Sequence, residues 1–138
     1  MSEIYKDDHS NEWFFTKNSY ILSETDEKGT ILYANDIFCK IAGYTLEELI
    51  GEPHNIVRHP DMPRIAFAGL WNDIQTKGFW NGIVKNKRKD GGHYWVNATA
   101  LRRVGANGKV TYLSIRTVPN RSVVASCIDL YAELKSKE

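Results

Sequence analysis

The segment from His54 to Pro63, which reads HNIVRHPDMP, gathers several side chains that could do chemistry. Histidine and carboxylate groups ligate zinc or iron, but no helical i, i+4 spacing joins His54, His59 and Asp61, and the charge of Arg58 would repel a metal ion. Arg58 and His59 fit an anion better, because a guanidinium forks onto phosphate, and Asp61 could then orient Arg58. An ordinary surface pair of Arg58 with Asp61 also accounts for the spacing. The segment alone leaves these interpretations open.

The composition narrows the class of protein. The chain has 138 residues, of which 42% are hydrophobic and 25% charged, and its formal net charge is +1. These values are typical of one soluble globular domain, and the near-neutral charge argues against a dedicated nucleic-acid binder. No apolar run is long enough to insert into a bilayer and the N-terminus lacks a signal-peptide core, so a cytoplasmic protein is expected. Cys39 and Cys127 lack metal or disulfide spacing and are expected to be buried, reduced thiols.

The elements that must position the segment begin with short ones. The aromatic run WFF predicts a short helix within residues 11–19, packed on the domain's own sheet or on a second subunit. Two β-prone runs, YILSET and TILYAN, flank the turn DEKG and predict a hairpin. Asn35 or Asp36 can cap a short helix after it, and Thr45 with Glu48 matches a capping box that opens another.

The second half of the chain predicts one longer helix, a meander and a last helix. Apolar spacing predicts a helix from Pro63 to Gly78, and short turns join the strand-like runs FWNGIVKNKRK, HYWVNATALRRV and VTYLSIRTV. The predicted fold class is α+β: a five-stranded antiparallel sheet with short helices on one face, a cavity between them, and an N-terminal cap helix and a C-terminal helix. The expected divisions are an N-terminal cap segment, residues 1–19, a main domain, residues 20–119, and a C-terminal helix, residues 120–138, which contacts another helix or packs on its own domain.

Strand alternation assigns side chains to the two faces of the sheet. Asn86 shares a face with Trp80, Gly82 and Val84, and its amide could recognise a ring edge of mixed polarity. Ala98 and Ala100 leave room above the neighbouring strand, either for a ligand or for a closely approaching helix. Trp71 is either core or a stacking wall. The opposite face is predicted to carry an apolar surface of Ile83, Trp95, Leu101 and Tyr112.

Taken together, NDIFCKIAGYTLEELIGEPHNIVRHPDMP, FAGLW, GIVKNKRKDGGHYWV and YLSIRT resemble a PAS domain. AGYTLEELIG and KNKRKDG are generic features of that family. PHNIVRHPDMP is much more specific, and resembles the flavin-binding PAS domain of bacterial aerotaxis receptors. The resemblance covers the chain from about Tyr20 to Leu134. It implies a PAS fold that encloses FAD, senses redox or oxygen state, and signals by protein–protein contact as in aerotaxis and energy taxis.

The resemblance also implies which residues hold the cofactor. Asn86 would hydrogen-bond the isoalloxazine edge, and Trp71 would flank the ring. The other implied cofactor-binding residues are Asn35, His54, Arg58, His59, Asp61, Phe67 and Tyr94. The implied partner is a chemoreceptor-type signalling protein or a HAMP-like segment, and a homodimer is compatible with the pattern. Because aerotaxis receptors continue into membrane-spanning and signalling segments, this chain is expected to be a lone PAS protein or a fragment.

Three rival functions remain at this point. A haem-binding PAS gas sensor would use His54 or His59 as the axial ligand. A cofactor-free PAS interaction module would use Ala98 and Ala100 only to admit a helix. An enzyme is the least supported, because no nucleophile–base pair and no convergent carboxylates are visible, so no catalytic or metal-binding residues are expected. A cysteinyl photoadduct is also not expected, since HNIVRHPD contains no cysteine.

Overall fold

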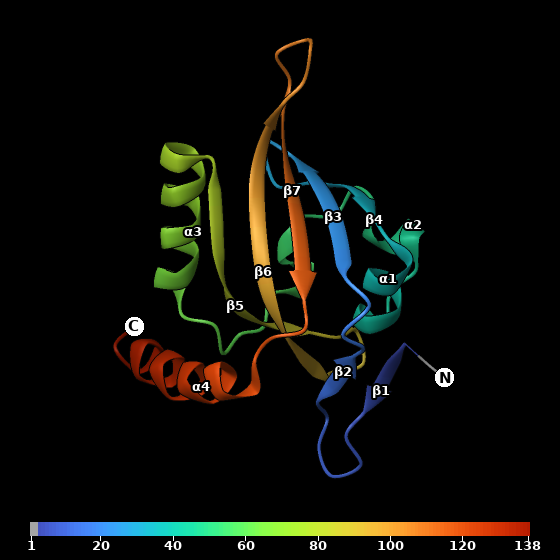
Figure 1. The fold of residues 1–138 in the computed structure, drawn as a ribbon, viewed down its shortest axis with the longest axis vertical. Helices are drawn as coiled ribbons and strands as arrows, with labels where there is room; N and C mark the ends of the chain where they lie inside the picture. Colours follow the sequence, from blue (N-terminus) through green and yellow to red (C-terminus); the bar gives the residue numbers. More distant parts are fainter. Residues whose placement is uncertain (1–2) are drawn as a thin grey trace.

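A five-stranded antiparallel sheet forms the centre of the computed structural model, which describes residues 3–138 (Figure 1). The strand order is β4-β3-β7-β6-β5. The strands are β3 Ile21–Asp26, β4 Ile31–Ala34, β5 Phe79–Lys87, β6 His93–Val104 and β7 Val110–Thr117. The helices are α1 Asp36–Ala42, α2 Leu46–Leu49, the 3-10 helix η1 His54–Val57, α3 Arg64–Lys77 and α4 Arg121–Ser136. Helices segregated from an antiparallel sheet confirm the predicted α+β class.

Local sequence signals explain where the helices begin and end. The Asn35 side chain accepts a hydrogen bond from the Phe38 N–H and caps α1. Thr45 and Glu48 form both bonds of the predicted capping box at the start of α2. Gly78 ends α3 with φ of 83°, a left-handed conformation that glycine adopts without steric cost. The capping signals read from the sequence are therefore confirmed.

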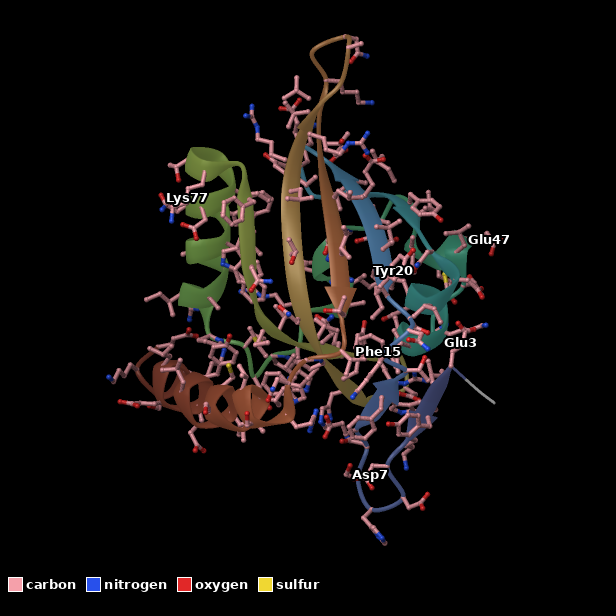
Figure 2. The ribbon with its side chains drawn as sticks, viewed as in Figure 1. Glu3, Asp7, Phe15, Tyr20, Glu47 and Lys77 are labelled. Carbon is pink, nitrogen blue, oxygen red and sulfur yellow. The ribbon has the colours of Figure 1, made fainter. Side chains whose placement is uncertain are left out.

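The N-terminal segment corrects one prediction. Strands β1 (Ile4–Lys6) and β2 (Trp13–Phe15) form an antiparallel hairpin where a cap helix was expected. Aromatic side chains favour strands, and the Tyr5 and Phe14 rings stack across the hairpin with 5.3 Å between centroids. Phe15 is buried in the domain, whereas Asp7 lies in the loop that joins the two strands (Figure 2). The segment therefore packs on its own domain, as one of the two predicted alternatives had it.

The main core lies between one face of the sheet and helices α1 and α2. Its completely buried side chains include Ile21, Ile31, Phe38, Ile41, Leu49 and Val96. Helix α3 lies beside β5 at the other end of the sheet (Figure 1), and Ile74 is its one buried residue. Because burial of apolar surface holds helices in place, α3 is attached more weakly than α1.

The register of β6 and β7 corrects a second prediction. Tyr112 pairs with Arg102, and Ser114 pairs with Ala100, which places Tyr112 on the same face as the two alanines. The expected apolar surface on the opposite face therefore loses Tyr112. Alternation within a strand shows which residues share a face of that strand. Which face of β7 continues a given face of β6 depends on how the two strands pair across the turn at residues 105–109.

Helix α4 packs at the end of the sheet where β5 and β6 carry Ile83 and Trp95. The Tyr131 ring stacks on Trp95 with 6.3 Å between centroids, and its hydroxyl donates to the Ile83 carbonyl at 2.6 Å. These contacts attach α4 to its own domain. Between residues 3 and 138, no helix has the length and hydropathy needed to cross a bilayer.

Candidate functional site

A mostly apolar cavity of about 180 Å³ lies between α3, η1 and the concave face of β5, β6 and β7. Its walls combine aromatic and aliphatic side chains with a few polar groups. The residues that define it best are Phe67, Leu70, Trp71, Ile74, Trp80, Val84, Asn86, Ala98, Ala100, Tyr112, Ser114 and Arg116, with His54, Asn55 and Arg58 at one end. Such a concave apolar site with few convergent polar groups is the usual form of a ligand pocket. Ala98 and Ala100 do provide the open space that the sequence left undecided.

Two buried donors in this cavity wall have no protein acceptor. Asn86 is only 4% exposed, and its Nδ2 forms no hydrogen bond of ordinary geometry, although its amide lies close to the Tyr94 hydroxyl. Arg116 is also 4% exposed, and its Nη1 has no acceptor. An unsatisfied buried donor costs about 1–3 kcal/mol, so both atoms favour a ligand that presents acceptors to them.

The electrostatics of the cavity are set by Arg116. No aspartate or glutamate lies among the residues lining the cavity, and Arg116 forms no ion pair with any residue the structure describes. Burial lowers the pKa of Arg116 to about 10, so the guanidinium remains charged at neutral pH. A buried cation without a carboxylate is expensive, which favours an electron-rich or anionic group in the cavity.

His54 is held as a neutral partner of this cation. Burial, together with the positive charge of Arg116, lowers the pKa of His54 to about 3. Arg116 Nη2 therefore donates to His54 Nε2, and Ser23 Oγ lies 3.1 Å from the same nitrogen. An axial bond from His54 Nε2 to haem iron would have to displace both contacts.

Several residues singled out in the sequence meet at the cavity. His54, Arg58, Phe67, Trp71 and Asn86 all line it. The Arg58 guanidinium lies over the Phe67 ring, 3.7 Å from its centroid, and this contact fixes the η1 end of the cavity against α3. Their expected role in binding a cofactor stays a prediction.

Tyr94 lies beside Asn86 on the same face of the sheet but does not line the cavity. It pairs with Asn86 across β5 and β6 and is completely buried. Burial raises the pKa of Tyr94 to about 12, while the charge of Arg116 and the Asn86 amide act in the opposite direction. A neutral hydroxyl beside Asn86 could orient the amide that faces the cavity.

Three expected site residues lie elsewhere. Asn35 uses its amide to join the Leu22 N–H and the Tyr20 carbonyl to α1, so its bonds are structural. His59 lies in a separate recess outside the cavity. Asp61 forms an ion pair with Lys85 at 2.8 Å, which contradicts the expectation that it orients Arg58. Lys85, one residue before Asn86 on β5, lies beside the segment that carries Asp61 and takes the place expected for Arg58.

Arg116 and Trp80 were missed as site residues in the sequence. A signal for Arg116 exists, because in YLSIRT the arginine alternates with Ser114 on the side that carries small residues. Only the pairing of Arg116 with Ala98 shows that this side faces the cavity. Trp80 was correctly placed on the face of Asn86 but was not assigned to the site.

The cavity is small, and the helix α3 that forms one of its walls is only slightly buried. Its volume lies below the roughly 300–1,000 Å³ of typical small-molecule sites. Trp71, which is 41% exposed, meets Tyr112 edge-to-face with ring centroids 5.5 Å apart and stands where the cavity reaches solvent. A large planar ligand therefore requires α3 to move away from the sheet, which its limited burial permits.

Metal binding finds no support in the arrangement of side chains. Across residues 3–138, no three or more His, Cys, Asp or Glu side chains cluster as metal ligands would. His59 and His93 lie near one another, with ring centroids 6.1 Å apart, but burial, and after it the positive charge of Lys85, lowers the pKa of each.

Comparisons with known proteins agree with this geometry. Residues 31–116 match the PAS fold family model. The chain is 48% identical over 84% of its length to the aerotaxis receptor of Escherichia coli, and 33% identical over 72% to a nitrogen fixation regulatory protein of Klebsiella oxytoca, but spans only 23% and 21% of those proteins. A solved PAS domain from Colwellia psychrerythraea, 24% identical, superposes with a TM-score of 0.66 over 74% of this chain and 87% of that one. The chain therefore belongs to the PAS fold family.

Proposed function

We propose that this chain is a flavin-binding PAS sensor that detects redox or oxygen state and reports it by protein–protein contact. The observation that carries the proposal is the pair of unsatisfied donors, Asn86 Nδ2 and Arg116 Nη1, in an otherwise apolar cavity. The edge of an isoalloxazine ring offers acceptors within an apolar, planar body, which matches both features. FAD is the proposed flavin, because HNIVRHPDMP resembles the aerotaxis-receptor subgroup.

The residues of the cavity divide the work of holding such a ring. Asn86 and Arg116 would hydrogen-bond its polar edge, while Trp71, Phe67 and Trp80 would enclose its faces. When bound, a flavin supplies a centre that gains and loses electrons and protons. The protein would respond to that change through Asn86, whose amide can present either its NH₂ donor or its carbonyl acceptor to the ring. The Tyr94 hydroxyl lies beside Asn86 and could hydrogen-bond the amide group that does not face the ring.

A short path leads from Asn86 to the surface of the domain. The preceding residue of β5, Lys85, points to the opposite face, where it pairs with Asp61, and its Nζ lies 6.0 Å from the centroid of the Trp95 ring. Trp95 in turn stacks on Tyr131 of α4. A change at Asn86 could therefore alter the docking of α4 through adjacent side chains.

Signalling by contact is the proposed mode of action, and no catalytic role is proposed. Its relatives are named a receptor and a regulatory protein, which supports a signalling protein as the partner. A homodimer and a cytoplasmic location form part of the same proposal.

The test is an absorbance spectrum of freshly purified protein before and after dithionite. We expect flavin bands that bleach on reduction, and FAD in the supernatant after denaturation. The Asn86→Ser variant should shift these bands, whereas the control Asn81→Ser, on the opposite face of β5, should not. A Soret band would support a haem-binding sensor instead. A colourless protein that takes up no added flavin would exclude the flavin sensor and favour the cofactor-free interaction module.

A further inference from the structure

Gly82 is the one glycine that lies inside a β-strand within residues 3–138. Its φ is not positive, so the backbone conformation of β5 does not call for a glycine at this position. A glycine inside a strand weakens it, because no side chain packs there, and it often marks a place where another group approaches the backbone closely. The reason for Gly82 is therefore to be found in the group that lies above it.

The group above Gly82 is the indole of Trp80, which precedes it by two residues on the same face of β5. A Cβ placed on Gly82 would lie 2.4 Å from Trp80 Cζ2 and 2.5 Å from Trp80 Cη2, whereas carbon atoms in contact are about 3.5–4.0 Å apart. The benzo end of the indole therefore rests directly on the backbone of Gly82. Across β5 and β6, Gly82 lies opposite Ala98 and Trp80 lies opposite Ala100, so no large side chain of β6 lifts the indole away from the sheet.

The indole lies at one end of the cavity face of β5, and the Asn86 amide lies at the other. Trp80, Val84 and Asn86 all line the cavity. Gly82 is four residues from Asn86, a span of about 13 Å at roughly 3.3 Å per residue. This span is comparable with the long axis of three fused rings. A planar ring whose polar edge faces Asn86 would therefore have its other end over the Trp80 indole.

We propose that Gly82 is a positioning residue of the flavin site: it lets the Trp80 indole lie low on β5, where the indole is a stacking surface for the end of the ring remote from Asn86. This inference rests on the proposed flavin function and adds which residue sets the depth of the cavity on the sheet side. A side chain at position 82 would push the indole into a cavity of only about 180 Å³, into the space that the ring needs.

A purely structural role for Gly82 has different consequences. Trp80 also packs against the hydrophobic core, so a glycine at position 82 could serve only to admit the indole to that packing. A substitution of Gly82 would then change the free energy of unfolding but not the fluorescence of a bound flavin. Spectroscopy of the bound ligand therefore separates a positioning role from a structural one.

The experiment is a double-mutant cycle on the full chain, read by FAD affinity and by the fluorescence of the bound flavin. An indole stacked on a flavin quenches its fluorescence, because it gives an electron to the excited ring and takes it back. Gly82→Ala should weaken FAD binding about tenfold and raise the fluorescence of the bound flavin. Trp80→Phe removes both atoms that meet the added Cβ and should raise the fluorescence by itself. In that background, Gly82→Ala should change the affinity by less than about twofold and leave the fluorescence as it is.

The control is Gly69→Ala, on the exposed side of α3, where an added Cβ meets no atom within 4 Å, and both readouts should stay as in wild type. Trp71 is present in every variant, so the comparison isolates Trp80. An equal loss of affinity from Gly82→Ala in both backgrounds, or no rise of fluorescence in Gly82→Ala, would overturn the positioning role. If Gly82→Ala does not fold, fluorescence unchanged in Trp80→Phe would overturn it instead. Failure of wild type to bind FAD would overturn the proposed function itself.

Discussion

Two arginines are buried in this domain, and they are held in different ways. Arg88 is 8% exposed and is fully engaged: it donates to the Lys40 and Ile41 carbonyls, pairs with Asp90, and lies 3.7 Å from the centroid of the Trp13 ring. Arg116 is buried with a neutral histidine and no carboxylate. Arg88 therefore joins the hairpin, α1 and β5, whereas Arg116 has bonding capacity left for a ligand.

This contrast predicts opposite results for the same substitution. Arg88→Met should lower the free energy of unfolding by roughly 3 kcal/mol, because it leaves buried carbonyls unsatisfied. Arg116→Met should not lower it in flavin-free protein, because an unpaired buried charge is removed with little change in volume. Urea unfolding of both variants checks this, and a large loss of stability in Arg116→Met would show that the arginine is structural. The Arg116→Met variant should also bind flavin more weakly than wild type.

His54 predicts how stability depends on pH. Its pKa is lowered from 6.5 to about 3, so between these values the unfolded chain binds a proton that the folded chain does not. Stability should therefore fall as the pH drops below about 6.5, by up to roughly 1.4 kcal/mol per pH unit from this residue. His59 and His93, whose pKa values are also lowered, add to the same slope.

The measurement is urea unfolding of flavin-free protein between pH 7 and 5. His54→Gln should have a clearly shallower pH dependence than wild type. His9→Gln, which alters an exposed loop of the hairpin, should keep the full slope. An unaltered slope in His54→Gln would mean that folding does not change the pKa of His54.

At the scale of elements, α4 is attached by a small number of contacts. Val124 is its one buried residue, whereas Val123, Ile128 and Leu130 are 44%, 49% and 50% exposed. Tyr131 supplies both the ring stack on Trp95 and the hydrogen bond to the Ile83 carbonyl. A helix held in this way can change its docking at low cost, as a signalling element requires.

The prediction for this element is a selective loosening. Tyr131→Phe should keep the ring stack but leave the Ile83 carbonyl unpaired, at a cost of about 1 kcal/mol. Hydrogen exchange should quicken at amides of α4 while the sheet keeps its protection. Tyr33→Phe, which removes an exposed hydroxyl on β4, is the control and should change neither region. Uniform quickening across the sheet would show that α4 is part of the main folding unit.

At the scale of the molecule, one half of the domain is well buried and the other half is less buried. Helices α1 and α2 cover the sheet over the well-buried core, and Glu47 of α2 and Lys77 of α3 lie on opposite sides of the molecule (Figure 2). The cavity lies under α3, at the less buried end. We therefore expect a ligand to enter on the α3 side, where the domain can open without disturbing the core.

This division predicts the kinetics of flavin exchange. Trp71→Ala should raise both the association and the dissociation rate of flavin about threefold to tenfold. The reason is that the substitution removes the edge-to-face contact with Tyr112, which joins α3 to the sheet at the opening of the cavity. Stopped-flow fluorescence measures both rates. Ile65→Ala, on the exposed side of the same helix, should leave them as in wild type. Rates unchanged in Trp71→Ala would mean that ligands enter elsewhere.

Much of the architecture could be predicted because its signals are local. Asn35, Thr45 and Gly78 mark helix ends through bonds and dihedral angles that involve only nearby residues. The same holds for strand alternation, which correctly put Trp80, Val84 and Asn86 on one face. The WFF run was predicted wrongly as a helix because a three-residue run carries no periodicity to separate helix from strand.

The sequence by itself determined the fold class and the order of the elements from residue 20 onward, because periodicity and caps act within a few residues. The residues His54, Arg58, Phe67, Trp71 and Asn86 were singled out through the resemblance to a PAS domain, and all five line the cavity. The tertiary structure alone decided that Arg116 and Tyr112 face the cavity, that Asp61 pairs with Lys85, and that Glu138 reaches Arg64. Those contacts depend on strand register and on segments far apart in the chain, for which no local pattern exists.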